Sequence, residues 1–147
     1  MAITHLSTYR IGLVQAQAYR MLQQHFRAGL EPFHITIPEW SLLGVVFDGG
    51  QLSLTEITHI LKSKASHPTV LVETLVERGL LDRQVHPKDK RTKVVTVTAA
   101  GKKLIPQIEA SVRASIRSAI QHVPRPELEV YYRVLAMFAA SVTPDGE

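Results

Sequence analysis

The chain has 147 residues and a formal net charge of +4 at pH 7, with 45% hydrophobic and 20% charged residues. These values are typical of one folded domain rather than of a disordered chain. The chain contains no cysteine, which excludes disulfide bonds, thiolate catalysis and cysteine-based zinc sites. No apolar run approaches the ~18 residues of a membrane-spanning helix, and the first ten residues lack a secretion-signal pattern.

Residues 4–28 are expected to form one long helix. Apolar side chains recur there at helical spacing, and Gly29 follows as an expected helix stop. A helix of this length exceeds what a compact small domain needs. It fits either a core helix or a helix at a dimer interface, and the pattern alone does not separate the two.

The starts of the next two helices carry the same capping signal. Thr36 and Glu39 fit a capping box, in which the N-cap hydroxyl and the carboxylate three residues later each accept a backbone N–H. Ser53 and Glu56 repeat this pattern. The helix that starts at Thr36 is expected to run through Phe47, shortly before two glycines. The helix that starts at Ser53 is expected to stop near residue 62.

Another short helix follows a turn expected at residues 63–65. Ser66 is a candidate N-cap, Pro68 lies in the first turn, where its missing N–H costs nothing, and Gly79 ends the helix. Apolar residues at positions 71, 72 and 75 form its buried stripe. Residues 53–79 are therefore expected to form a helix-turn-helix, a pair that also occurs in helical bundles without any role in DNA binding.

A basic hairpin is expected directly after this pair. Residues 80–86 and 94–98 are typical of strands, and residues 87–92 form the tip between them. Five basic and two acidic residues lie between Asp82 and Lys93, so +3 of the net charge of +4 falls in this segment. This is the layout of a winged helix, in which a helix enters the major groove of DNA and a hairpin reaches the minor groove. The alternative is a solvated charged loop.

Two further helices are expected in the C-terminal part. An apolar stripe runs from Leu104 to Ile120, with a kink expected at Pro106. The sequence Pro-Arg-Pro at 124–126 breaks the chain, and apolar residues from Leu128 to Phe138 line a last helix. The apolar stripes are wider than one small winged helix could cover, which favours a dimer.

Five short motifs resemble those of the MarR-type winged helix-turn-helix regulators of bacteria and archaea. They are TIPEW (36–40), LSLTEI (52–57), ERGL (77–80), DKR (89–91) and TAAG (98–101). The resemblance implies a mainly α fold with a small β-hairpin wing in a single domain, 1–147. The DNA-binding lobe would cover 36–98, and 1–35 and 99–147 would form a helical dimerisation region. It further implies a cytoplasmic homodimer that binds an inverted-repeat operator in double-stranded DNA, acts as a repressor, and is released by a small, often aromatic and anionic, effector.

The resemblance also implies roles for residues of the hairpin tip. Arg91 would enter the minor groove, and Asp89 would orient it. A guanidinium suits a narrow minor groove, which is strongly negative. Lys88, Lys90 and Lys93 are interpreted as phosphate contacts, which position the protein without reading sequence.

The helix expected between Ser66 and Gly79 departs from the family pattern. Many members carry an arginine where this chain has Val70, and a valine can pack on a thymine methyl but cannot hydrogen-bond a guanine. Any operator sequence carried over from the family is therefore in doubt. The polar candidates for DNA contact are Lys64, Ser66, His67 and Thr69.

Other functions find less support in the sequence. Residues Tyr9, Arg10, Arg20, His34 and Trp40 are candidates for an effector pocket, although Trp40 is better explained as a core residue. The seven histidines are scattered, and no nucleophile elbow or phosphate-binding loop is present, so we predict neither an enzyme nor a cofactor. We assign no metal ligands. The alternatives are a zinc-responsive regulator on the same fold, or a dimeric protein-interaction module without DNA binding, which would not need the basic hairpin.

Overall fold

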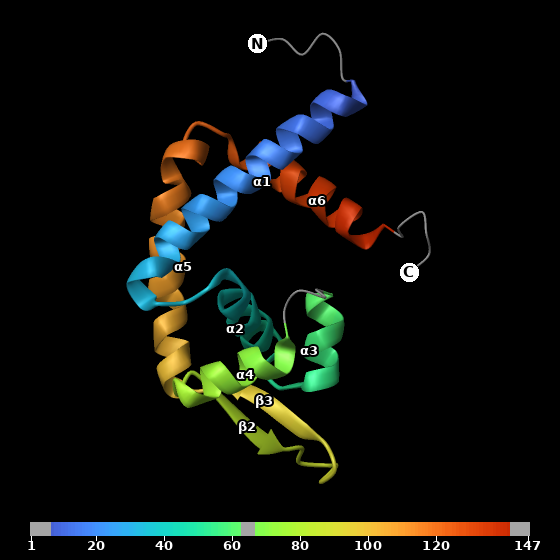
Figure 1. Ribbon diagram of the computed structural model, residues 1–147, viewed down its shortest axis with the longest axis vertical. Helices are drawn as coiled ribbons and strands as arrows, with labels where there is room; N and C mark the ends of the chain where they lie inside the picture. Colours follow the sequence, from blue (N-terminus) through green and yellow to red (C-terminus); the bar gives the residue numbers. More distant parts are fainter. Residues whose placement is uncertain (1–6, 63–66, 142–147) are drawn as a thin grey trace. The chain divides into compact units, whose positions relative to one another are not determined.

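The computed structural model describes residues 7–62 and 67–141 (Figure 1). It confirms a mainly helical fold with a small sheet. The chain divides into two compact units, residues 1–115 and 116–147. The elements are α1 (Thr8–Leu30), a 3₁₀ turn η1 (Glu31–Phe33), α2 (Ile37–Gly49), β1 (Leu52–Ser53), α3 (Leu54–Leu61), α4 (Pro68–Glu77), β2 (Leu81–Val85), β3 (Lys93–Val97), α5 (Ala99–Ile120) and α6 (Arg125–Ala140).

The sheet has three strands where the sequence predicted two. Strand β3 pairs with β2 as an antiparallel hairpin and with β1 on its other edge, in the order β1-β3-β2. Leu52 of β1 faces Val95, and Leu81 of β2 faces Val97. A two-residue strand is too short to show the alternation that marks strands in a sequence, and Ser53 also caps a helix.

One hydrophobic core lies within the first unit. It joins α2, α3 and α4 to the inner face of the sheet and to the first half of α5. Side chains with no exposed surface are Leu30, Leu42, Leu43, Val46, Ile57, Val72, Leu75 and Ile108. The core therefore fixes the helix-turn-helix, the hairpin and the ends of α1 and α5 as one body.

Both predicted capping boxes are confirmed. The Thr36 hydroxyl accepts the Glu39 N–H at 3.3 Å, and the Glu39 carboxylate accepts the Thr36 N–H at 2.9 Å. The equivalent distances at Ser53 and Glu56 are 3.2 and 2.7 Å. The Ser53 backbone N–H, followed by its hydroxyl, lowers the pKa of the Glu56 carboxyl. These bonds fix where α2 and α3 begin, and hence the direction of both helices.

The prediction that Gly29 stops the first helix is wrong. Helix α1 continues to Leu30, and Gly29 is buried against α5. A Cβ at Gly29 would lie 2.6 Å from the Cα of Val112, and the Ser111 hydroxyl donates to the Gly29 carbonyl at 2.7 Å. This glycine allows two helices to touch, a purpose that its position near a helix end does not reveal.

The C-terminal helices are placed along the sequence much as predicted. Helix α5 runs through Pro106 without interruption, so the kink expected there stays a prediction. The break at residues 124–126 is confirmed, because Pro124 is the N-cap of α6 and Pro126 lies in its first turn. In the second unit, α6 carries no buried residue.

Candidate nucleic-acid interface

Helix α4 buries one face and exposes the other. Val72 and Leu75 have no exposed surface, whereas Val70 is 58% exposed and Thr69 is also exposed. The predicted helix phase is therefore confirmed, with Val70 on the outer face. The N-cap is His67 rather than the predicted Ser66, and the His67 side chain makes no capping hydrogen bond. The candidates Lys64 and Ser66 lie outside the described residues.

The C-terminal end of α4 is held by backbone bonds of the Schellman type. The N–H of Leu80 donates to the carbonyl of Leu75, and that of Gly79 to Val76, both at 2.9 Å. Gly79 has a φ of 71°, which favours glycine. This confirms the predicted helix end and turns the chain directly into β2.

Arg78 links the end of α4 to the connection between α1 and α2. Its guanidinium donates to the carbonyls of His34 at 2.7 Å and Phe33 at 2.8 Å. A planar guanidinium is suited to such paired acceptors. His34 has a φ of 52°, so the bonds hold a left-handed turn that is uncommon for a residue other than glycine. The orientation of α4 is thus tied to the exit from α1.

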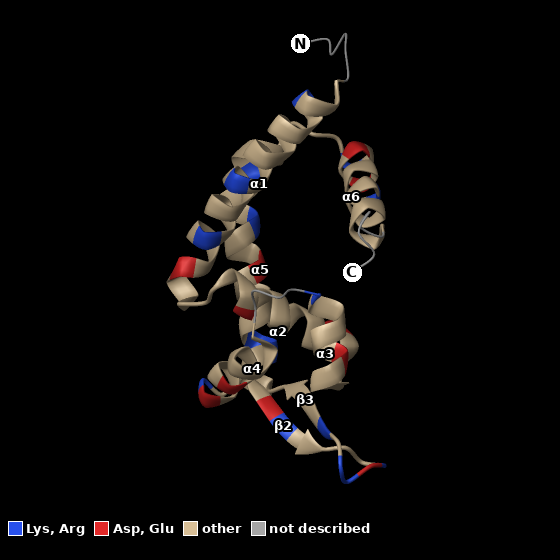
Figure 2. Ribbon diagram, turned by 45° about the vertical axis from the view of Figure 1, so that its right-hand side comes forward, with Lys and Arg blue, Asp and Glu red and all other residues tan. Residues whose placement is uncertain are grey.

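The β2–β3 hairpin forms a basic wing. Figure 1 shows it extending beyond α4, and Figure 2 shows basic residues gathered at its tip. The side chains of Lys88, Lys90, Arg91 and Lys93 are exposed. Arg83 of β2 lies instead 3.9 Å from the Glu73 carboxylate of α4, which joins the wing to that helix. The exposed cations at the tip are therefore those that the sequence singled out.

The Asp89 carboxylate binds Arg91 through the backbone, and its expected role in orienting the Arg91 side chain on DNA stays a prediction. Its carboxylate accepts the backbone N–H of Arg91 and the hydroxyl of Thr92, each at 3.0 Å. The ion pairs found within residues 7–62 and 67–141 do not join it to the Arg91 guanidinium. The N–H of Arg91 is the main cause of a lowered Asp89 pKa, with the Thr92 hydroxyl next. Asp89 thus shapes the backbone of the tip.

Sequence reasoning missed the part that His86 plays in this tip. Its Nδ1 atom accepts the backbone N–H groups of Lys88 and Asp89, at 3.1 and 3.2 Å. The only sequence signal is a histidine next to Pro87, just before the turn. A single histidine at such a position has many ordinary explanations.

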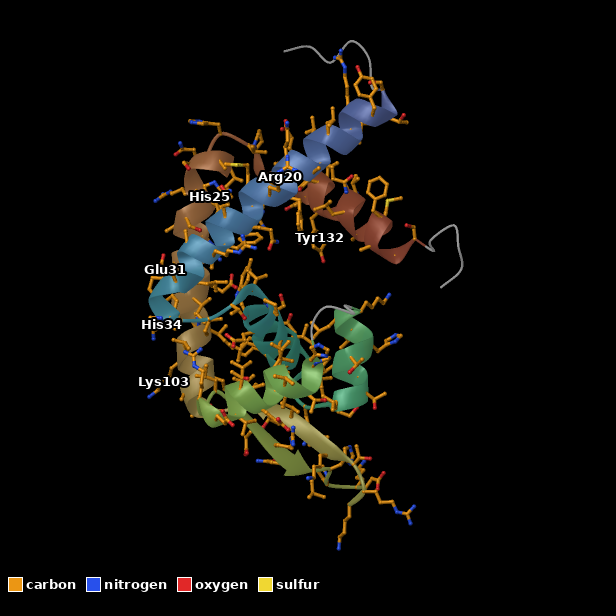
Figure 3. The ribbon with its side chains drawn as sticks, viewed as in Figure 1. Arg20, His25, Glu31, His34, Lys103 and Tyr132 are labelled. Carbon is orange, nitrogen blue, oxygen red and sulfur yellow. The ribbon has the colours of Figure 1, made fainter. Side chains whose placement is uncertain are left out.

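The candidate effector residues do not converge within one chain. Arg10 donates to the hydroxyl of its neighbour Tyr9 at 3.1 Å, near the start of α1. Trp40 packs edge-on against Phe26, 5.4 Å between ring centres. Seventeen residues of helix separate Tyr9 from Phe26, or about 25 Å at 1.5 Å per residue. Figure 3 shows Arg20 part-way along α1 and His34 beyond its end.

Trp40 is placed as a core residue with one polar contact. Its indole N–H donates to the Glu109 carboxylate of α5 at 3.2 Å, and its ring contacts the hydrophobic core. Among the residues described, no three His, Asp or Glu side chains come together as a metal site would require. No helix in the described ranges is long and apolar enough to cross a membrane.

A helix-turn-helix with an exposed face on α4, flanked by a basic wing, defines a winged helix DNA-binding protein. Residues 35–101 match the family model described as a winged helix DNA-binding domain. In sequence and fold the chain is similar to MarR-type winged helix-turn-helix transcriptional regulators.

Three known proteins illustrate the relationship. The HTH-type transcriptional repressor IacR of Pseudomonas putida is 23% identical over 120 residues, which cover 82% of this chain and 72% of IacR. CouR from Rhodococcus jostii RHA1, solved bound to p-coumaroyl-CoA, has a TM-score of 0.80 and 22% identity, covering 90% of this chain and 94% of CouR. A mutant of MarR from E. coli, solved with operator DNA, has a TM-score of 0.74 and 18% identity, covering 88% and 93%.

Proposed function

We propose that this protein is a cytoplasmic, dimeric repressor that binds an inverted repeat in double-stranded DNA and releases it when a small aromatic effector binds. The observation that carries the proposal is the placement of α4 and the wing on one rigid lobe. The exposed face of α4 offers Thr69 and Val70 to the major groove, and the wing offers Arg91 to the adjacent minor groove. The neighbouring lysines supply phosphate contacts and hence salt dependence.

Dimerisation follows from apolar side chains that one chain leaves exposed. The exposed apolar side chains on α1 and α6 are too numerous to be explained as isolated surface residues. A second copy of the chain is the partner expected for such faces, because an inverted-repeat operator needs two related lobes. The exposed residues are Tyr9, Ile11, Leu13, Val14, Tyr19, Met21, Val130, Tyr131, Tyr132, Val134, Leu135, Met137 and Phe138.

An effector of aromatic character is supported by the surroundings of Trp40. Its edge-on contact with Phe26 lies where the DNA-binding lobe meets α1, and Glu109 adds a polar group. An aromatic ring inserted there would separate α1 from α2. CouR was solved with p-coumaroyl-CoA, a ligand with an aromatic acyl group. Tyr9 and Arg10, near the start of α1, would reach such a site only from the second subunit.

The test is selection of bound fragments from the source genome, followed by footprinting. We expect a protected site with two related half-sites about 10 bp apart, or one helical turn, and affinity that falls steeply with salt. Equal binding to all fragments, or binding of one chain per site, would contradict the proposal. A protein-interaction module on the same fold would show no salt-sensitive duplex binding at all.

A further inference from the structure

The tip of the wing is organised by side chains as well as by backbone pairing. The β2–β3 ladder ends where the His86 N–H donates to the Thr92 carbonyl at 2.8 Å. Beyond it, the Thr92 N–H donates to the Asp89 carbonyl at 3.1 Å. The Asp89 carboxylate accepts the Arg91 N–H at 3.0 Å, so this half of the tip is fixed from within.

The other half of the tip depends on one atom. Pro87 has no N–H, and the next two N–H groups, of Lys88 and Asp89, both point to the Nδ1 atom of His86 at 3.1 and 3.2 Å. An imidazole nitrogen can accept hydrogen bonds only while it carries no proton. The observed tip therefore requires a His86 ring whose Nδ1 is unprotonated.

We propose that His86 is a positioning residue for DNA binding, whose neutral ring pre-forms the wing tip. The inference rests on the proposed function, in which Lys88 and Arg91 meet DNA. A tip already folded in its bound form avoids the entropy cost of ordering these residues on binding. His86 acts through the backbone and is not itself assigned a contact with DNA.

The charged groups around His86 determine how protonation of its ring changes the wing tip. Two carboxylates, Glu56 at the start of α3 and Asp89 in the tip, interact electrostatically with the ring, and Lys88 and Lys90 lie on the same loop. Protonation places an N–H against two other N–H groups and draws the ring toward these carboxylates. The tip then loosens while the positive charge of the wing increases. These two consequences change DNA affinity in opposite directions.

Three variants of His86 separate the possibilities. In His86→Asn, the side-chain oxygen occupies nearly the place of Nδ1 and accepts hydrogen bonds at every pH. His86→Gln is the matched control, because its oxygen lies one bond further out. His86→Ala removes the acceptor. Histidine changes charge between about pH 8 and about pH 5, and the remaining histidines are common to all four proteins.

Two measurements are made on the full-length protein. Without DNA, exchange of the Lys88 and Asp89 amide protons is followed by NMR at about pH 8 and about pH 5.5. With DNA, affinity for a selected operator is measured by anisotropy at the same two values. Because amide exchange is itself slower in acid, each amide is compared with the same amide in His86→Asn.

We expect His86→Asn to keep slow amide exchange and nearly the parent affinity at both pH values. The Ala and Gln variants should bind about fivefold more weakly at the higher pH, which corresponds to losing about one hydrogen bond. In acid, the Lys88 and Asp89 amide protons of the parent protein should exchange faster relative to those of His86→Asn, because a protonated Nδ1 no longer accepts their hydrogen bonds. Unchanged Lys88 and Asp89 exchange in His86→Ala, or exchange in acid that is equally slow in the parent protein and in His86→Asn, would overturn the inference. If no variant binds DNA, the proposed function fails, while the exchange data still decide the role of His86.

Discussion

Dimerisation through α1 and α6 can be tested by removing one exposed aromatic side chain, in Phe138→Ala. Phe138 is 65% exposed in the single chain, which is about 130 Å² if a phenylalanine presents roughly 200 Å². Burial of that area at ~25 cal/mol per Å² is worth about 3 kcal/mol per side chain. If the interface covers half of it, the two copies together contribute about 3 kcal/mol, or somewhat over a hundredfold in the dimer dissociation constant.

Sedimentation equilibrium over a range of concentrations measures this constant directly. The matched control is Ile60→Ala, since Ile60 is 49% exposed but belongs to α3 rather than to α1 or α6. Circular dichroism should show that both variants fold, because neither side chain is buried. The reasoning is refuted if Phe138→Ala dimerises as tightly as the parent protein, or if Ile60→Ala weakens the dimer equally.

The further predictions concern the wing, the exposed face of α4 and the start of α3. Arg91→Ala should weaken operator binding by about 1–3 kcal/mol without unfolding the protein, whereas Lys88→Ala should reduce the salt slope by about one phosphate contact per subunit; anisotropy titrations at two salt concentrations measure both. Asp89→Ala should also weaken binding, because the tip loses its internal acceptor; tighter binding in the same assay would show that Asp89 merely repels phosphate. Val70→Ala should lower affinity modestly, and mainly for operators with thymine at one position; unfolding of this variant in circular dichroism would contradict its exposed placement. The lowered Glu56 pKa means that its capping contribution is present above its unfolded pKa, near 4.5, and is lost as the pH falls through the lower folded value; Glu56→Gln should therefore show a smaller drop in Tm than the parent protein between about pH 6 and about pH 3.

Local signals in the sequence were sufficient for most of the helices. The capping boxes at Thr36 and Ser53 use side chains three residues apart, so both partners lie in one window of sequence. Gly79 and Pro124 likewise act on the backbone next to them. The exposed phase of Val70 followed from the spacing of its apolar neighbours, since burial on α4 repeats with the helical period.

The features that were missed depend on residues distant in sequence. Position 29 requires a glycine because the backbone of Val112, more than eighty positions away in sequence, packs against it. From the sequence alone, this helix contact could not be distinguished from a helix stop. Strand β1 exists only because β3 is beside it. The Arg78 bonds to the η1 turn likewise join segments more than forty residues apart.

The wing tip shows a different limit. The sequence identified its charge and its turn, but the Asp89 carboxylate had two chemically reasonable partners in Arg91, the guanidinium and the backbone N–H. Residue types alone do not choose between them. The structure selects the backbone, and it adds His86 as the acceptor for the rest of the turn.

The central claim is that α4 lies in the major groove while the wing tip lies in the neighbouring minor groove. Because the chain contains no cysteine, a single introduced cysteine can carry an iron–EDTA group that cleaves nearby DNA. The most direct measurement maps the cuts made on one operator by labelled Thr69→Cys and Lys90→Cys, with Gln121→Cys as the control outside the DNA-binding lobe. We predict cuts within each half-site from position 69, cuts flanking them from position 90, a two-fold related pattern on the two strands, and none from position 121. Cuts from position 90 that coincide with those from position 69, or that are absent while the labelled protein still binds, would contradict the account.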